Sequence, residues 1–169
     1  MPFDKTKDIH LHFDLHPHLE GLEYEKLTAL DLGCGAYNSV VAAQVLDYPW
    51  KKLTGLDGYQ PDLDSAAEKP CVAKELVLKK GDVRKFTGKY DVILSFDVLE
   101  HMVKEEGIKW LERIEKAAKK RIVLFFPVEP EDFHRDNDWP ENPLQDHLSH
   151  WKGHELKSRG YEIAEFFGC

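Results

Sequence analysis

Residues 28–38 constrain the fold of this chain more than any other stretch. A short apolar run that contains Asp31 leads directly into Gly33 and Gly35, and a helix-compatible segment, 39–47, follows at once. Glycines at this spacing permit a tight turn, and a ligand can approach the main chain because no Cβ stands in its way. The pattern therefore predicts a strand, a turn and a helix whose unpaired N–H groups can face an anionic or carboxylate-bearing cofactor.

Two classes of cofactor use such a turn. The dinucleotide fingerprint requires a third glycine at position 38, where this chain has Asn38. A carboxylate at Asp31, two residues before Gly33, is unfavourable beside a pyrophosphate but suits a cofactor that carries an ammonium or a sulfonium. The sequence therefore favours a cationic cofactor over NAD.

The run Asp31-Leu32-Gly33-Cys34-Gly35 resembles motif I of the class I (Rossmann-like) S-adenosylmethionine-dependent methyltransferases. The resemblance implies that S-adenosyl-L-methionine is the cofactor and that Asp31, Gly33, Cys34 and Gly35 contact it. It also implies a three-layer α/β sandwich with a mostly parallel twisted sheet.

Two further acids follow predicted strands. Asp57 ends the strand 53–57 and precedes Gly58, so its carboxylate can accept both ribose hydroxyls, although an ordinary turn aspartate is the alternative. Asp82 follows the strand 75–79, and the resemblance implies that it accepts a hydrogen bond from the adenine amino group while Val83 contacts the ring. A Gly-Asp pair is also a common turn.

Residues 90–96 form the clearest strand, because a continuous apolar run suits burial on both faces of a parallel sheet. The residues after it resemble the family's motif at that place, which implies that Asp97 lines the methionine end of the cofactor and Val98 packs on the adenosine. His101 is a candidate catalytic base, with capping of the next helix as the alternative.

The remaining pattern predicts a helix over 104–119, a strand over 121–127, a helix over 146–159 and a sixth strand over 161–167. The resembled fold normally has a seventh, antiparallel strand, for which the sequence has no segment. The sixth strand then pairs directly with the fifth, the chain is truncated, or a partner fills the gap. An unpaired edge would favour association, such as a homodimer.

We expect two segments outside the predicted sheet to border the cofactor or the acceptor. Residues 1–26 form an N-terminal arm or lid, and residues 128–146 form a loop on the substrate side. The candidate acceptor-binding residues lie in or just after this loop, and they are Phe133, His134, Trp139, His147 and His150. His147, His150 and His154 share one face of the predicted helix. We expect no metal site, because the histidine spacings match no structural zinc pattern.

Composition limits the class of protein. The chain has 169 residues with 42% hydrophobic and 32% charged residues, which predicts one globular domain over 1–169. A formal charge of −8 disfavours nucleic acid as a partner. The absence of an apolar run of about 18 residues or a signal peptide disfavours a membrane and leaves the cytoplasm as the expected compartment.

Taken together, these features predict a methyltransferase that modifies an oxygen or nitrogen of a small-molecule acceptor. Such chemistry asks the protein mainly to align donor and acceptor, since the cofactor carries the activated group. One alternative is a non-catalytic module or partner subunit that binds S-adenosylmethionine or S-adenosylhomocysteine. An NAD-dependent enzyme is the other, and Asp31 and Asn38 disfavour it.

Overall fold

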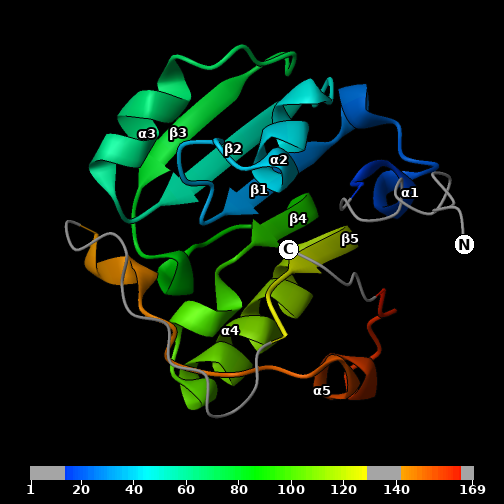
Figure 1. Cartoon of the computed structure of the whole chain (residues 1–169). Helices are drawn as coiled ribbons and strands as arrows, with labels where there is room; N and C mark the ends of the chain where they lie inside the picture. The colour runs from blue at the N-terminus through cyan, green and yellow to red at the C-terminus, as the bar shows by residue number, and fades with distance from the viewer. Residues whose placement is uncertain (1–13, 129–141, 165–169) are drawn as a thin grey trace, which may run out of the picture.

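The computed structural model describes residues 14–128 and 142–164. Its centre is a sheet of five parallel strands in the order β3-β2-β1-β4-β5 (Figure 1). The strands are β1 (Thr28–Leu32), β2 (Lys52–Asp57), β3 (Leu76–Lys80), β4 (Tyr90–Phe96) and β5 (Ala118–Phe125). The order reverses between β1 and β4, and open α/β sheets bind ligands at the carboxyl ends of the strands beside such a switch point.

Helices cover both faces of the sheet, which confirms the three-layer α/β architecture (Figure 1). One layer contains α1 (His16–Leu19), α2 (Val40–Ala43) and α3 (Gln60–Ala67), and the other contains α4 (Lys104–Ala117) and α5 (Gly153–Ser158). The two layers have separate cores because alternate strand residues point to opposite faces. Ala29 packs in the first core and Leu30 in the second.

Short 3₁₀ turns complete the described chain. They are η2 (Tyr24–Lys26), η3 (Gln44–Asp47), η4 (Val83–Lys85), η5 (Leu99–His101) and η6 (Pro143–Gln145). The helix predicted after the glycines is thus divided into α2 and η3, with the Ser39 hydroxyl accepting a hydrogen bond from the Ala42 N–H at 3.0 Å. Because α2 has only four residues, it offers a weak helix dipole to a phosphate.

α4 follows its predicted range closely. Trp110, Leu111 and Ile114 form its buried stripe, whereas Ile108 is 39% exposed. Gly107 of α4 packs directly against Trp151, since a Cβ at position 107 would lie 2.6 Å from Cζ2 of Trp151. The α4 stripe therefore meets the chain segment that leads into α5.

Two predictions near the carboxyl end differ from the structure. The helix expected over 146–159 is present only at Gly153–Ser158, so His147 and His150 lie in an irregular segment before it. The sixth strand expected over 161–167 is absent from residues 161–164, and the rest of that range lies outside the described residues. The expected stripe of three histidines on one helix face is therefore wrong.

Candidate active site

The two glycines of the turn have different surroundings. Gly33 has φ of 72°, and a Cβ there would lie 2.3 Å from Cγ2 of Val98. Gly35 has φ of 53°, and among the described residues, its two chain neighbours aside, no atom lies within 4 Å of the position of its missing Cβ. The left-handed backbone favours glycine at both positions. Val98 therefore fills the space beside Gly33, and only Gly35 leaves room for a ligand next to the main chain.

Asp57 ties this turn to the ends of the neighbouring strands. Its Oδ2 accepts a hydrogen bond from the Gly35 N–H at 2.9 Å, and its Oδ1 accepts one from the Tyr59 N–H at 2.8 Å. The Gly81 N–H donates to the Asp57 carbonyl at 2.8 Å. The half-buried carboxylate keeps further acceptor capacity, since each oxygen can accept two hydrogen bonds.

Asp31 lies buried beneath the turn, with 1% of its surface exposed. Burial raises the pKa of this carboxyl to about 7, and the charge of Asp57 acts in the same direction, while the Tyr37 hydroxyl opposes the shift. Among the described residues, neither carboxylate oxygen has a hydrogen bond of good geometry. A cation or donor delivered by a ligand near the turn would therefore favour the ionised form.

The residues around Asp31 also explain the buried cysteine. Gly55 makes room for Cys34 and Tyr37, because a Cβ at Gly55 would lie 2.9 Å from the cysteine Sγ and 3.0 Å from the tyrosine Oη. Burial raises the pKa of the Cys34 thiol, and the nearby carboxylates add to the effect. A thiol in this state is a packing group and a poor nucleophile.

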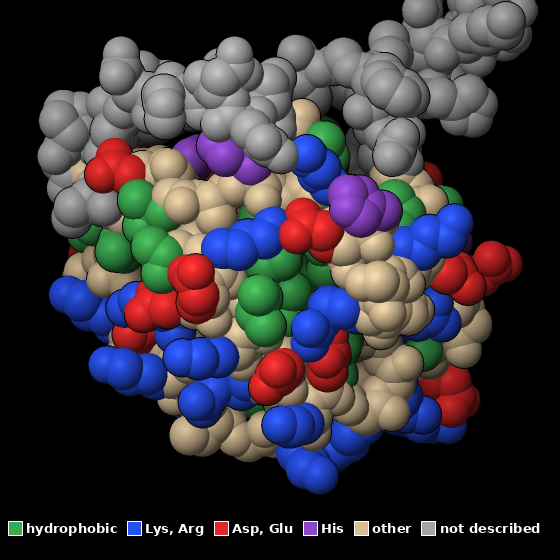
Figure 2. Space-filling view, turned by 90° about the horizontal axis from the view of Figure 1, so that it is seen from below, with side chains coloured by type: hydrophobic (Ala, Val, Ile, Leu, Met, Phe, Trp, Pro, Cys, Tyr) green, Lys and Arg blue, Asp and Glu red, His purple; other side chains and the backbone are tan. Residues whose placement is uncertain are grey.

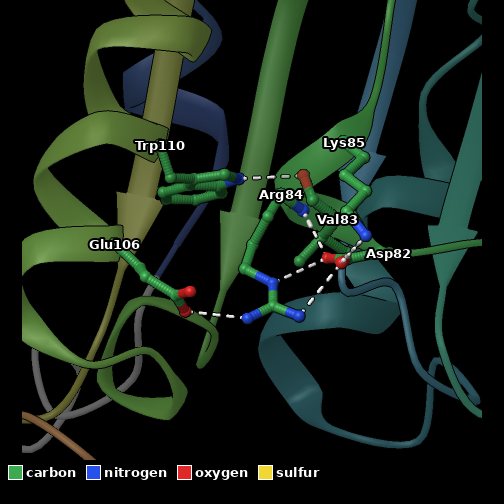
Figure 3. Close-up of polar contacts among 6 residues, drawn as sticks. All are labelled: Asp82, Val83, Arg84, Lys85, Glu106 and Trp110. Carbon is green, nitrogen blue, oxygen red and sulfur yellow. Dashed lines mark hydrogen bonds and ion pairs between the residues drawn. The ribbon is translucent and has the colours of Figure 1, made fainter.

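Asp82 follows β3 and holds an arginine. Arg84 Nε lies 2.8 Å from Asp82 Oδ1, while its Nη1 lies 2.7 Å from Glu106 Oε2, so the guanidinium bridges η4 and α4 (Figure 3). Hydrogen bonding to Arg84 lowers the pKa of Asp82 to about 2. The carbonyl of Val83 accepts a hydrogen bond from Trp110 Nε1 at 3.1 Å. The Asp82 carboxylate is thus engaged by protein donors.

A cavity of about 1380 Å³ follows β5 along its whole length and reaches the turn after β4, and its lining includes Asp97, Glu100, His101 and His147. Asp97 is exposed and has φ of 52°, a strained conformation outside glycine. Its N–H donates to the Phe125 carbonyl at 2.9 Å, which joins the ends of the two strands. The turn after β4 thus directs a strained acidic residue to the cavity.

His101 contacts the segment before α5. Its Nδ1 lies 3.0 Å from the Asp146 carbonyl oxygen, and its ring meets the His147 ring edge-on at a centroid distance of 4.9 Å. The N-cap of α4 is Val103, which has no side-chain cap hydrogen bond. His101 is therefore not the N-cap residue of α4, and its catalytic role stays a prediction.

Leu144, in η6, lies over the end of β2. A Cβ at Gly58 would be 2.7 Å from Leu144 Cδ1 and 3.8 Å from the Gly81 carbonyl oxygen, yet the leucine side chain is 52% exposed. Part of the loop predicted on the substrate side thus reaches Gly58, the residue after Asp57. Neither Leu144 nor Glu100 was predicted from the sequence. Glu100 could have been found from its place beside His101.

The structure brings together most of the predicted site residues at one edge of the sheet. Asp31, the glycines and Asp57 form the turn, Asp82 and Val83 follow β3, and Asp97 and Val98 follow β4. His150 lies near the N-terminus of α4, where its carbonyl accepts a hydrogen bond from Lys104 Nζ at 2.6 Å. Phe133, His134 and Trp139 lie outside the described residues.

The sheet order and the glycine turn define a Rossmann-like domain of the methyltransferase type. A family model described as a methyltransferase domain matches residues 10–162, and the chain therefore belongs to that family. A search of curated proteins returned no match. In the part of the chain that the structure describes, no helix has both the length and the apolar character needed to cross a bilayer.

Three solved structures are similar in fold. The magnesium protoporphyrin IX methyltransferase from Synechocystis PCC 6803 with bound S-adenosylmethionine is 21% identical, with a TM-score of 0.54 over 85% of this chain and 63% of that chain. TehB from Haemophilus influenzae is 16% identical, with a TM-score of 0.56 over 79% and 44%. The small RNA methyltransferase HEN1 is 20% identical, with a TM-score of 0.56 over 78% and 18%. The chain thus spans less than two thirds of each.

Proposed function

We propose that this chain is an S-adenosylmethionine-dependent methyltransferase domain that acts on an oxygen or nitrogen of a small-molecule acceptor. The observation that carries the proposal is the turn at Gly35, where an open main-chain position lies hydrogen-bonded to Asp57 and above the buried Asp31. Family membership and the bound S-adenosylmethionine of the Synechocystis enzyme support the same cofactor.

The residues fit a cationic cofactor better than a dinucleotide. Asp31 is a buried carboxylate whose oxygens lack well-formed hydrogen bonds in the described structure, so it gains from a nearby ammonium or sulfonium. A pyrophosphate at the same turn would meet that carboxylate and only a four-residue helix. Bound S-adenosylmethionine would supply an activated methyl group, and the protein would supply alignment.

Three acidic residues would make polar contacts with the cofactor. Asp57 would accept the ribose hydroxyls on its remaining lone pairs, and Asp97 would lie at the methionine end. Asp82 could accept the adenine amino group only by sharing its oxygens with Arg84. Leu144 would have to move, since it occupies the space over Gly58 on the route from Asp57 to Asp82.

The acceptor would enter the cavity beyond β4. The Asp146 carbonyl favours the tautomer of His101 that is protonated at Nδ1, so Nε2 can accept a proton from an acceptor hydroxyl or amine. Figure 2, from the side of α4 and α5, shows Lys and Arg interspersed with Asp and Glu, a pattern that suits a small acceptor better than a phosphate backbone.

Transfer of a labelled methyl group tests the proposal. The full chain is incubated with donor labelled in the methyl group and a fractionated metabolite pool, next to Asp57→Ala and the exposed control His154→Ala. We expect label in a low-molecular-weight product for the wild type and His154→Ala and little for Asp57→Ala. Intact S-adenosylhomocysteine binding without any transfer would favour the non-catalytic module.

A further inference from the structure

Two histidines and a glutamate meet where the segment before α5 contacts η5. One ligand atom each from Glu100, His101 and His147 can be chosen so that all three lie within 4.8 Å of one another. Glu100 Oε1 lies 3.9 Å from His101 Nε2. His147 follows His101 by 46 positions in the chain, so the fold, rather than local sequence, brings it to the other two residues.

Backbone hydrogen bonds hold this cluster in place. The N–H groups of Leu148 and Ser149 donate to the Glu100 carbonyl at 2.7 and 3.1 Å, which fixes His147 against η5. The Asp146 carbonyl lies 3.0 Å from His101 Nδ1 and orients the ring so that Nε2 faces the Glu100 carboxylate. A backbone carbonyl on the second nitrogen is the usual support for a metal-binding histidine.

We propose that Glu100, His101 and His147 bind one divalent transition-metal ion. Two imidazoles and a carboxylate suit zinc, iron(II), manganese or cobalt, and three protein ligands leave coordination positions open. Ligand atoms around such an ion lie about 3.4 Å apart, so Glu100 Oε1 and His101 Nε2 must approach by roughly 0.5 Å, and no pair of the three ligand atoms must approach by more than roughly 1.4 Å. Glu100 is 2% exposed, and a cation would compensate its buried charge.

The position of the ion indicates what it would do. All three ligands line the cavity that follows β5 to the turn after β4, so the open coordination positions are available to a molecule bound there. This step rests on the proposed function: the acceptor would carry an oxygen donor, such as a hydroxyl or carboxylate, that binds the ion. His101 Nε2 would then serve as a ligand instead of a base.

Cobalt(II) titration of the metal-free full chain tests the site. We expect one ion per chain with visible absorption bands of a four- or five-coordinate site, and displacement of the cobalt by zinc. Loss of an outer-shell contact typically weakens metal binding by about 10–100-fold. His147→Ala removes a direct ligand and should therefore weaken cobalt binding by more than this. His154→Ala, an exposed histidine on α5, should bind as the wild type does. Absence of saturable binding, or equal binding by His147→Ala, would overturn the proposal.

Two controls distinguish loss of the metal site from unfolding of the variant and from failure of the proposed cofactor binding. Because Glu100 is buried, Glu100→Gln can disturb folding, so thermal unfolding of each variant is recorded without metal, and a folded His147→Ala decides the question. Calorimetry with S-adenosylhomocysteine is run on the same samples. Cofactor binding without metal binding would refute the metal site alone, and metal binding without cofactor binding would refute the proposed function alone.

Discussion

Replacement of the buried acid Asp31 by asparagine should make the protein more stable at alkaline pH. The carboxyl has 1% of its surface exposed, and burial raises its pKa to about 7 from 3.8. Between pH 4 and pH 7 the Asp31 carboxyl is therefore protonated in the folded protein and ionised in the unfolded chain. The unfolded state binds fewer protons, so the free energy of unfolding falls as pH rises through this window.

The magnitude follows from the two pKa values. A pKa of about 7 in the folded state, against 3.8 in the unfolded chain, corresponds to at most about 4 kcal/mol of destabilisation above pH 7, because each pH unit between the two values contributes about 1.4 kcal/mol. About 2.5 kcal/mol of this should develop between pH 5 and pH 8.5. Asparagine has nearly the shape of the protonated acid and cannot ionise, so Asp31→Asn should not show this loss.

Urea unfolding of the two proteins at pH 5 and pH 8.5 measures the effect. We expect Asp31→Asn to gain about 2.5 kcal/mol relative to the wild type between these pH values. Asp64→Asn, which alters an exposed acid on α3, is the matched control and should show no comparable gain. A difference between Asp31→Asn and the wild type that does not change with pH would refute the reasoning.

Three further predictions concern the edge of the sheet. Gly33→Ala should lower the free energy of unfolding by about 2–4 kcal/mol, because it combines φ of 72° with a contact of 2.3 Å to Val98, whereas Gly35→Ala has no such contact and should cost only about 1–2 kcal/mol. Chemical denaturation compares the pair, and equal losses would contradict the assigned packing. Asp57→Ala should weaken S-adenosylhomocysteine binding by about 2–4 kcal/mol in calorimetry, and unchanged affinity would mean that the ribose binds elsewhere. Leu144→Ala should tighten the same binding by about 0.5–1 kcal/mol, since less apolar surface must be displaced from Gly58; weaker binding would indicate that the leucine packs on the cofactor instead.

The sequence was informative where local backbone chemistry decides the structure. The glycines after β1, the acids after β2 and β3, and the apolar run of β4 each predicted their element and its place at the carboxyl edge. These features depend on residues next to one another in the chain. The strand ends then meet because parallel strands end at the same edge of a sheet.

The sequence was misleading where distant hydrogen bonds decide the structure. Residues 146–152 have a helical pattern, but the N–H groups of Leu148 and Ser149 donate to the Glu100 carbonyl and cannot form the helical bonds. The contact of His101 with His147 follows from this and has no local signal. Likewise, no sequence rule shows that Asp82 holds Arg84 while the guanidinium also reaches Glu106.

Isothermal titration calorimetry of the full chain with S-adenosylhomocysteine and, separately, with NAD tests the central claim most directly. We expect saturable binding of S-adenosylhomocysteine at one site per chain and no measurable heat with NAD. Tight NAD binding without any response to S-adenosylhomocysteine would contradict the account.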